Sequence, residues 1–131
     1  MTDLFVRALL GHLVGDYLLQ TKKMALKKSQ PDLSGLWWCL FHCSVYTFVV
    51  CLFWWTANPV VIALVFLSHY PIDRWSLASK WLKLIGSRDF IAAHYSNDEY
   101  KDLDVAFSCL VYAVADNTFH LVLLWLITKL F

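Results

Sequence analysis

Histidine and aspartate recur in this sequence four residues apart, within stretches that are otherwise apolar. The pairs are His12 with Asp16, His69 with Asp73, and Asp116 with His120. A spacing of four places both members of a pair on one face of an α-helix. Neutral imidazole and ionised carboxylate are side chains that bind divalent cations, and helical bundles build such sites from inward-facing side chains on neighbouring helices. The pattern therefore predicts a shared metal or proton site.

A fourth histidine, His42, lies in residues 33–57, which contain no aspartate, glutamate, lysine or arginine, and belongs to the same set. An aspartate inside a hydrocarbon layer costs about 2.5 to 3.5 kcal/mol on the insertion scale, so three of them cost roughly 8 to 10 kcal/mol. That is comparable with the whole stability of a small domain. We therefore expect the aspartates to face one another, water or a cation, with one or two divalent ions of Zn, Mn, Fe or Mg. The predicted ligands are His12, Asp16, His42, His69, Asp73, Asp116 and His120.

The composition is that of a membrane protein. Of the 131 residues, 60% are hydrophobic and 16% are charged, against about 45 to 50% and 25% in ordinary soluble domains. The net charge is +1, and the basic residues lie beside apolar segments rather than in a separate patch. We therefore expect the lipid bilayer as a partner and no nucleic acid.

Four segments are long enough to cross a bilayer, which takes about 20 residues of helix. They are residues 3–20, 33–57, 59–78 and 103–130. Residues 79–102 mix Trp81 and other apolar side chains with basic ones, which is typical of a helix on a membrane surface; a solvated linker is the alternative. We predict an all-α fold with one domain over residues 1–131, consisting of four transmembrane helices and a cytoplasmic interfacial helix.

Charge and residue order agree on how these segments cross. Nine of the eleven lysines and arginines lie in the loops after the first and third segments, and the positive-inside rule places both loops in the cytoplasm. Both termini are then non-cytoplasmic. The first and third segments run inward and carry histidine before aspartate, while the fourth runs outward and carries aspartate before histidine. All three aspartates therefore fall at about the depth of His42, roughly 20 to 22 Å from the outer helix ends.

The four cysteines all lie in apolar segments, where we expect reduced thiols rather than disulfides. Cys39 and Cys43 share a helix face with His42, so a thiolate metal site is an alternative there. The first segment lacks a basic start and a cleavage site, so we do not expect it to be a removable signal peptide.

Four stretches carry a resemblance to a known family. They are GHLVGDYLLQTKKMA (residues 11–25), FHCSVYT (41–47), LSHYPIDRW (67–75) and ADNTFHL (115–121). Together they resemble the small bacterial and phage membrane proteins catalogued as domain of unknown function 3307. Asn117 stands where the family pattern has glutamine, and Pro71 interrupts the third motif. The resemblance implies a multi-pass helical protein of the bacterial inner membrane and names no substrate.

These residues favour a hydrolase that uses metal to cut a phosphoester or acyl bond at the cytoplasmic face. The His/Asp pattern is also similar to that of small membrane proteins known as metal-dependent hydrolases, by analogy alone. We expect Asp16, His42 and Asp116 to be catalytic. The expected substrate is a lipid or a small phosphorylated compound.

Three other functions stay open. A cation or proton transporter or channel would use the same side chains as a relay, and its four short spans would have to form a homo-oligomer to make a path. A non-catalytic assembly protein would use the polar layer to specify helix pairing. Heme with two histidines as axial ligands is the weakest alternative, since three aspartates favour a hard divalent ion.

Overall fold

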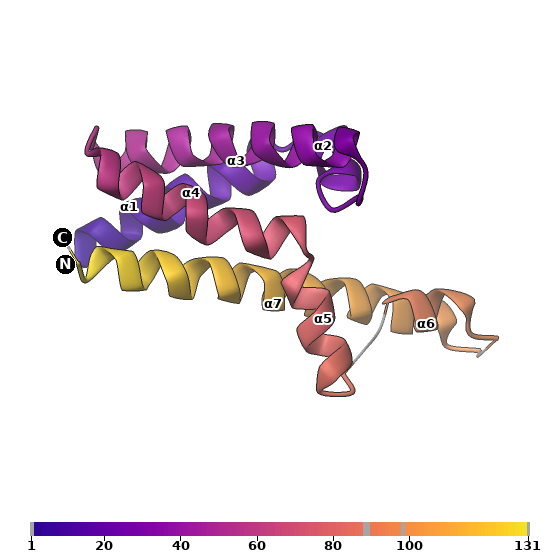
Figure 1. Cartoon of the computed structure of the whole chain (residues 1–131). Coiled ribbons are helices and arrows are strands. Elements are labelled where there is room, and N and C mark those ends of the chain that lie inside the picture. The colour runs from indigo at the N-terminus through magenta and orange to yellow at the C-terminus, as the bar shows by residue number, and fades with distance from the viewer. Residues whose placement is uncertain (1, 88–89, 98, 131) are drawn as a thin grey trace.

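The chain folds into helices, without strands, over the residues that the computed structural model describes, which are 2–87, 90–97 and 99–130. Figure 1 shows their course. In chain order they are α1 (Thr2–Leu13), the π-helix η1 (Val14–Leu18), α2 (Lys22–Lys27), α3 (Leu33–Trp54), α4 (Pro59–Arg74), α5 (Leu77–Leu84), α6 (Phe90–Tyr95) and α7 (Lys101–Thr128). The expected all-α fold is confirmed.

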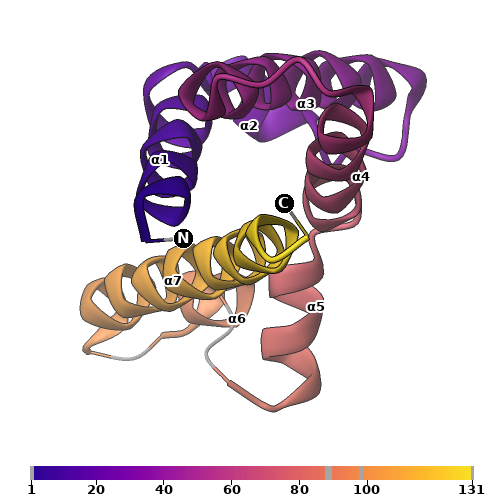
Figure 2. The ribbon, with the colours of Figure 1, turned by 90° about the vertical axis from the view of Figure 1, so that its left-hand side faces the viewer.

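Four helices, α1, α3, α4 and α7, form a closed ring. Both α1 and α4 pack against α3 and against α7, and in the view along the bundle the four helices occupy the sides of a square (Figure 2). Both termini lie at one end of the bundle, and α2 lies at the other (Figure 1). Side chains from all four helices can therefore meet inside the ring.

The interior near the termini is an apolar core. It contains Ala8, Tyr46, Val50, Trp54, Val61, Val65, Leu124 and Ile127. On its own helix, each of these residues lies between the histidine and the end of the bundle that holds both termini. The Trp54 indole N–H also donates to the Leu4 carbonyl oxygen at 3.0 Å, which satisfies its polar edge. The core therefore closes the terminal end of the ring.

Side-chain caps determine where two ring helices begin. The Asn58 side-chain oxygen accepts a hydrogen bond from the Val60 N–H at 2.9 Å, and Pro59 takes the first helical position of α4. Asp32 caps α3 in the same way by accepting from the Gly35 N–H at 2.7 Å.

Two of the four expected membrane spans have the length and composition of a membrane helix. Among the described residues these are α3, with 22 residues, and α7, with 28. The helices α1 and α4 have 12 and 16 residues, which is shorter than the roughly 20 residues that one crossing takes. The bundle of four transmembrane helices therefore stays a prediction, and so does the side that each terminus faces.

The single interfacial helix predicted over residues 79–102 is wrong in its bounds. Ser76, with a φ of 48°, separates α4 from α5, and Gly86, with a φ of 65°, follows the end of α5. Left-handed backbone cannot continue a right-handed helix, so the segment divides into α5 and α6. Residues 88, 89 and 98 of this segment lie outside the described residues.

Candidate metal centre

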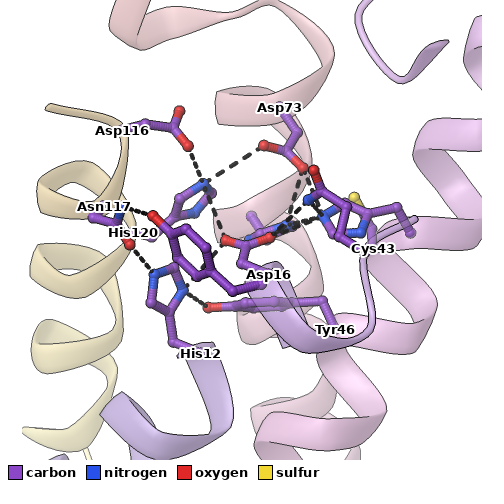
Figure 3. A network of polar contacts seen from close by, with 12 residues as sticks. His12, Asp16, Cys43, Tyr46, Asp73, Asp116, Asn117 and His120 are labelled. Carbon is purple, nitrogen blue, oxygen red and sulfur yellow. Dashed lines mark hydrogen bonds and ion pairs between the residues drawn. The ribbon is translucent and has the colours of Figure 1, made fainter. Parts of the chain in front are cut away.

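The side chains predicted as ligands come together inside the ring (Figure 3). The first helical stretch supplies His12 and Asp16, α3 supplies His42, α4 supplies His69 and Asp73, and α7 supplies Asp116 and His120. The four histidines and Asp73 are buried, whereas the Asp16 and Asp116 side chains are 8% and 19% exposed. Asp116 therefore has the most exposed side chain of the seven.

Four donor atoms form the tightest part of the cluster. His42 Nε2 lies 3.0 Å from Asp16 Oδ1, 3.0 Å from Asp73 Oδ2 and 3.1 Å from His69 Nε2. His69 Nε2 lies 3.1 Å from Asp73 Oδ2 and 3.6 Å from Asp16 Oδ1. Two ligands of one ion with bonds of about 2.1 Å lie about 3.4 Å apart in tetrahedral and about 3.0 Å apart in octahedral coordination. These four atoms therefore have the spacing of ligands to a single ion.

Protons alone do not satisfy these four atoms. A neutral imidazole nitrogen carries at most one proton, yet His42 Nε2 faces two carboxylates and a second imidazole nitrogen within 3.1 Å. The opposite ring nitrogens, Nδ1 of His42 and of His69, have no hydrogen-bond partner in the described part of the chain. One cation among the four facing atoms would satisfy all of them at once.

Asp73 also belongs to a second group of donors. Its Oδ1 lies 3.6 Å from His120 Nε2, which lies 3.7 Å from Asp116 Oδ2. His120 Nε2 has no hydrogen-bond partner among the described residues. Asp73 thus presents one oxygen to each group, as a carboxylate that bridges two ions does.

His12 lies beside these two groups, and both of its ring nitrogens are already bonded. Its Nε2 donates to Asn117 Oδ1 at 2.7 Å, and its Nδ1 accepts from the Tyr46 hydroxyl at 3.1 Å. The Asn117 amide in turn donates to the Tyr17 hydroxyl. His12 Nδ1 is also 3.4 Å from Asp16 Oδ2, but it carries no proton in this tautomer and so makes no hydrogen bond to that carboxylate.

Stacked rings hold the histidines of α4 and α7 in position. The Tyr46 ring lies on His69 with a centroid distance of 3.6 Å and an interplanar angle of 16°. His69 in turn stacks on His120 with a centroid distance of 4.2 Å. These contacts fix the planes of both imidazoles, so their Nε2 atoms point at the carboxylates.

Two glycines allow the first helical stretch to approach α3 closely. A Cβ at Gly11 would lie 3.0 Å from Val50 Cα, and a Cβ at Gly15 would lie 2.9 Å from the Tyr46 ring. Such distances are too short for a side chain, so larger residues at either position would push the helices apart. The two glycines are four residues apart along the chain, as are His12 and Asp16, and each glycine directly precedes one member of that pair.

Asp16 itself lies in the π-helix η1. The Leu19 N–H donates to the Val14 carbonyl oxygen at 3.0 Å, which spans five residues instead of four. Such wide turns are frequent at functional sites, and the extra residue in the turn changes the direction of the side chains that follow. In this chain the wide turn brings Asp16 to both His12 and His42.

Lys28 adds a cation that the sequence analysis did not predict. Its Nζ lies 2.8 Å from Asp73 Oδ2, and its side chain is 13% exposed. Burial disfavours the charged ammonium, but the carboxylates of Asp73 and Asp16 outweigh burial and raise the pKa of Lys28. Lys28 is therefore charged at neutral pH beside the four donor atoms.

The loop between α2 and α3 is held so that Lys28 reaches the cluster. The Arg74 guanidinium donates to the carbonyl oxygens of Lys28, at 3.4 Å, and of Gln30. Gly35 lets this loop approach α3, because a Cβ there would collide with the Gln30 carbonyl and lie 2.9 Å from the Lys27 carbonyl oxygen.

Gln20 is a second residue whose contact was not predicted. Its amide donates to Asp16 Oδ1 at 3.3 Å and to His42 Nε2 at 3.2 Å. Gln20 follows Asp16 by four residues, and that spacing is a signal that could have identified it. Lys28 carried no comparable signal, because a loop rather than a helix face brings it to Asp73.

The cysteines remain thiols, as expected. All four are free, and the Cys39 and Cys43 sulfur atoms lie 3.9 Å apart. Neither cysteine belongs to a group of described residues that could hold a metal ion. The alternative thiolate site around His42 is therefore not formed, since the Nε2 of this ring faces aspartates.

A family model matches the chain over nearly its whole length. Comparison with curated proteins and with solved structures gives no match. The family model described as "Protein of unknown function (DUF3307)" matches residues 4–131, a range that contains the whole cluster and Lys28. The resemblance of the four quoted motifs is thereby confirmed, and the chain belongs to the DUF3307 family.

Proposed function

We propose that this protein is an integral membrane hydrolase whose polar cluster holds two divalent ions and cuts a phosphoester or acyl bond. The observation that carries the proposal is the position of Asp73. Its Oδ2 faces the Nε2 atoms of His42 and His69, and its Oδ1 faces the Nε2 atom of His120. The first two nitrogens also face Asp16, and the third also faces Asp116. Two adjacent donor groups that share one aspartate are the arrangement of two-metal hydrolytic centres.

The donor atoms indicate which ions would bind. The first group offers two imidazoles and two carboxylates, from Asp16, His42, His69 and Asp73, which suits Zn or Fe. The second group offers Asp73, Asp116 and His120, and its larger share of oxygen suits Mn or Mg. All four candidate metals predicted from the sequence therefore remain consistent with the two groups.

The side chains would divide the chemistry as follows. Ions held by these ligands supply Lewis-acid chemistry, which makes water a nucleophile near neutral pH. Asp116, the most exposed carboxylate, takes a proton from the attacking water. The water oxygen bonds to phosphorus or to the carbonyl carbon, the bond to the leaving oxygen breaks, and Asp116 returns the proton to that oxygen.

The surface of the ring supports a position inside the membrane. Large apolar side chains are exposed on α3 and α7, such as Trp37, Phe48, Phe107 and Val114. Lipid would cover the exposed surface of these side chains. With the basic loop of α2 in the cytoplasm, the cluster opens toward the cytoplasmic face.

Metal content tests this proposal. Protein purified in detergent should contain about two divalent ions per chain by elemental analysis, and Asp73→Asn should lose at least half of them because both groups use this residue. Asp102→Asn is the matched control, since Asp102 is exposed in the first turn of α7, away from the cluster.

Hydrolysis of phosphate or acyl esters should require the same ions and return when they are restored after chelation. Wild-type protein that is free of metal and equally stable with and without chelator would contradict the proposal and leave a structural polar network. Ion flux in liposomes that Asp73→Asn abolishes, without any hydrolysis, would support the relay instead.

A further inference from the structure

We infer that Lys28 is the anion-binding residue of this centre and that its ligand is the phosphate group of a phosphate monoester. The inference rests on the two-ion centre proposed above and narrows its substrate from a phosphoester or acyl ester to this one class. In the described part of the chain, Lys28 is the single lysine or arginine that pairs with a carboxylate of the cluster.

Lys28 occupies a position that a bound ion would claim. Its ammonium pairs with Asp73 Oδ2, the same oxygen that faces His42 Nε2 at 3.0 Å and His69 Nε2 at 3.1 Å. A divalent cation and an ammonium on one oxygen repel each other strongly where burial limits solvent screening. Ion binding therefore displaces the ammonium from Asp73 and leaves it without its counter-charge.

The displaced ammonium stays close to the cluster. Lys28 is the C-cap of α2, where its N–H donates to the Met24 carbonyl oxygen at 2.9 Å, and Arg74 donates to the carbonyl oxygens of Lys28 and Gln30. The backbone is thus attached on both sides, so the flexible side chain alone can move. Lys28 directly follows α2, which lies at the end of the bundle opposite the termini (Figure 1), so the ammonium stays on the side of the cluster away from the apolar core.

The charge of the loaded centre favours a dianion. Three carboxylates face two divalent ions and one ammonium, while the imidazole ligands are neutral. This leaves an excess of two positive charges beside side chains that are almost wholly buried. A phosphate monoester dianion cancels that excess, and a lysine ammonium is a common partner of its oxygens. A neutral acyl ester would leave the excess uncompensated.

Opposite changes in two affinities test the inference. In full-length protein loaded with Zn²⁺ or Mn²⁺, Lys28→Gln should weaken the binding of inorganic phosphate by about ten- to a hundredfold, the range for a hydrogen bond to a charged group. In phosphate-free buffer the same variant should bind the metal about tenfold more tightly, because its competitor for Asp73 is gone. If Lys28 merely stabilised the fold, replacing it with glutamine would not strengthen metal binding.

Two further variants control for folding and for charge. Lys27→Gln removes the neighbouring charge and should change neither affinity. Lys28→Arg keeps a cation and should retain phosphate binding even where Lys28→Gln proves unstable. Unchanged or weaker metal binding in a folded Lys28→Gln protein, or unchanged phosphate binding, would overturn the inference while leaving the two-ion centre intact. Wild-type protein without metal would instead overturn the proposed function.

The source of the phosphate group can be separated with two substrates. Nanodiscs containing phosphatidic acid present it on a lipid, and phenyl phosphate presents it on a soluble ester. Release of inorganic phosphate from either one, reduced in Lys28→Gln, supports the inference and identifies the source. Hydrolysis of an acyl ester, without release of inorganic phosphate from phosphatidic acid or phenyl phosphate, would overturn the inference.

Discussion

His12 differs from the other buried histidines of the cluster in what its ring nitrogens contact. Both are bonded to neutral groups, Asn117 and Tyr46, whereas the Nε2 atoms of His42 and His69 face carboxylates. A ring that is bonded on both sides has to give up a hydrogen bond before it can bind an ion. We therefore expect His12 to hold Tyr46 and Asn117 in place beside the cluster rather than to hold a metal.

Removing the hydrogen-bond acceptor of His12 tests this assignment. Asn117→Leu leaves the His12 Nε2–H buried and unpaired, which should lower the free energy of unfolding by about 1 to 3 kcal/mol. Thermal unfolding in detergent measures the loss, and metal content should stay at the wild-type value. Thr118→Val is the control, because its exposed hydroxyl bonds only to the Val114 carbonyl of its own helix. Metal loss as large as in Asp73→Asn would make His12 a ligand.

Periodicity was sufficient to predict which side chains meet, because most of the cluster comes from pairs four residues apart along the chain. It did not distinguish His12 from the other histidines, since that distinction depends on Asn117 and Tyr46 of two other helices. It also missed Lys28, whose contact with Asp73 joins residues 45 positions apart through a loop. Spacing along one helix holds no information about either contact.

Two elements depart from regular helix, and both position a charged group. The wide turn of η1 directs Asp16 toward His42, and the loop after α2 directs Lys28 toward Asp73. The sequence predicted one continuous helix over residues 3–20, because a π-turn changes the apolar pattern too little to be seen there. The predicted span over 59–78 likewise extended past the break at Ser76, where the backbone is left-handed.

Gly35 is the residue that the position of the α2 loop requires. Gly35→Ala places a methyl group against the Gln30 and Lys27 carbonyls, so the loop should move away and the protein should lose about 1 to 3 kcal/mol of stability. Thermal unfolding measures the loss, and limited trypsin digestion should cut faster after Lys27 and Lys28. Ser34→Ala, an exposed position in the same helical turn, should behave as wild type. Equal digestion rates in both variants would show that Gly35 does not control this loop.

The whole molecule places a polar layer against an apolar core inside one ring. Because α1, α3, α4 and α7 contact one another around that ring, no helix can leave the ring without exposing the buried aspartates or the core. The short helices α1 and α4 run beside α3 in the bundle (Figure 1). We therefore predict that α1 and α4 cross a membrane together with α3 and α7, the two described helices whose length and composition suit a crossing.

Cysteine labelling of the full-length protein decides between four crossings and two. Single cysteines at Asp3, Ser29, Ala57 and Lys83, all exposed positions, are introduced into a chain whose four native cysteines are alanine. If the whole ring crosses, sites 3 and 57 should react with an impermeant maleimide in intact cells, and sites 29 and 83 should react only after permeabilisation. If α3 and α7 alone cross, sites 3 and 29 would share one side of the membrane, and sites 57 and 83 would share the other. That second pattern would place the aspartates of the first and third segments outside the bilayer and remove the need for a membrane-embedded ion.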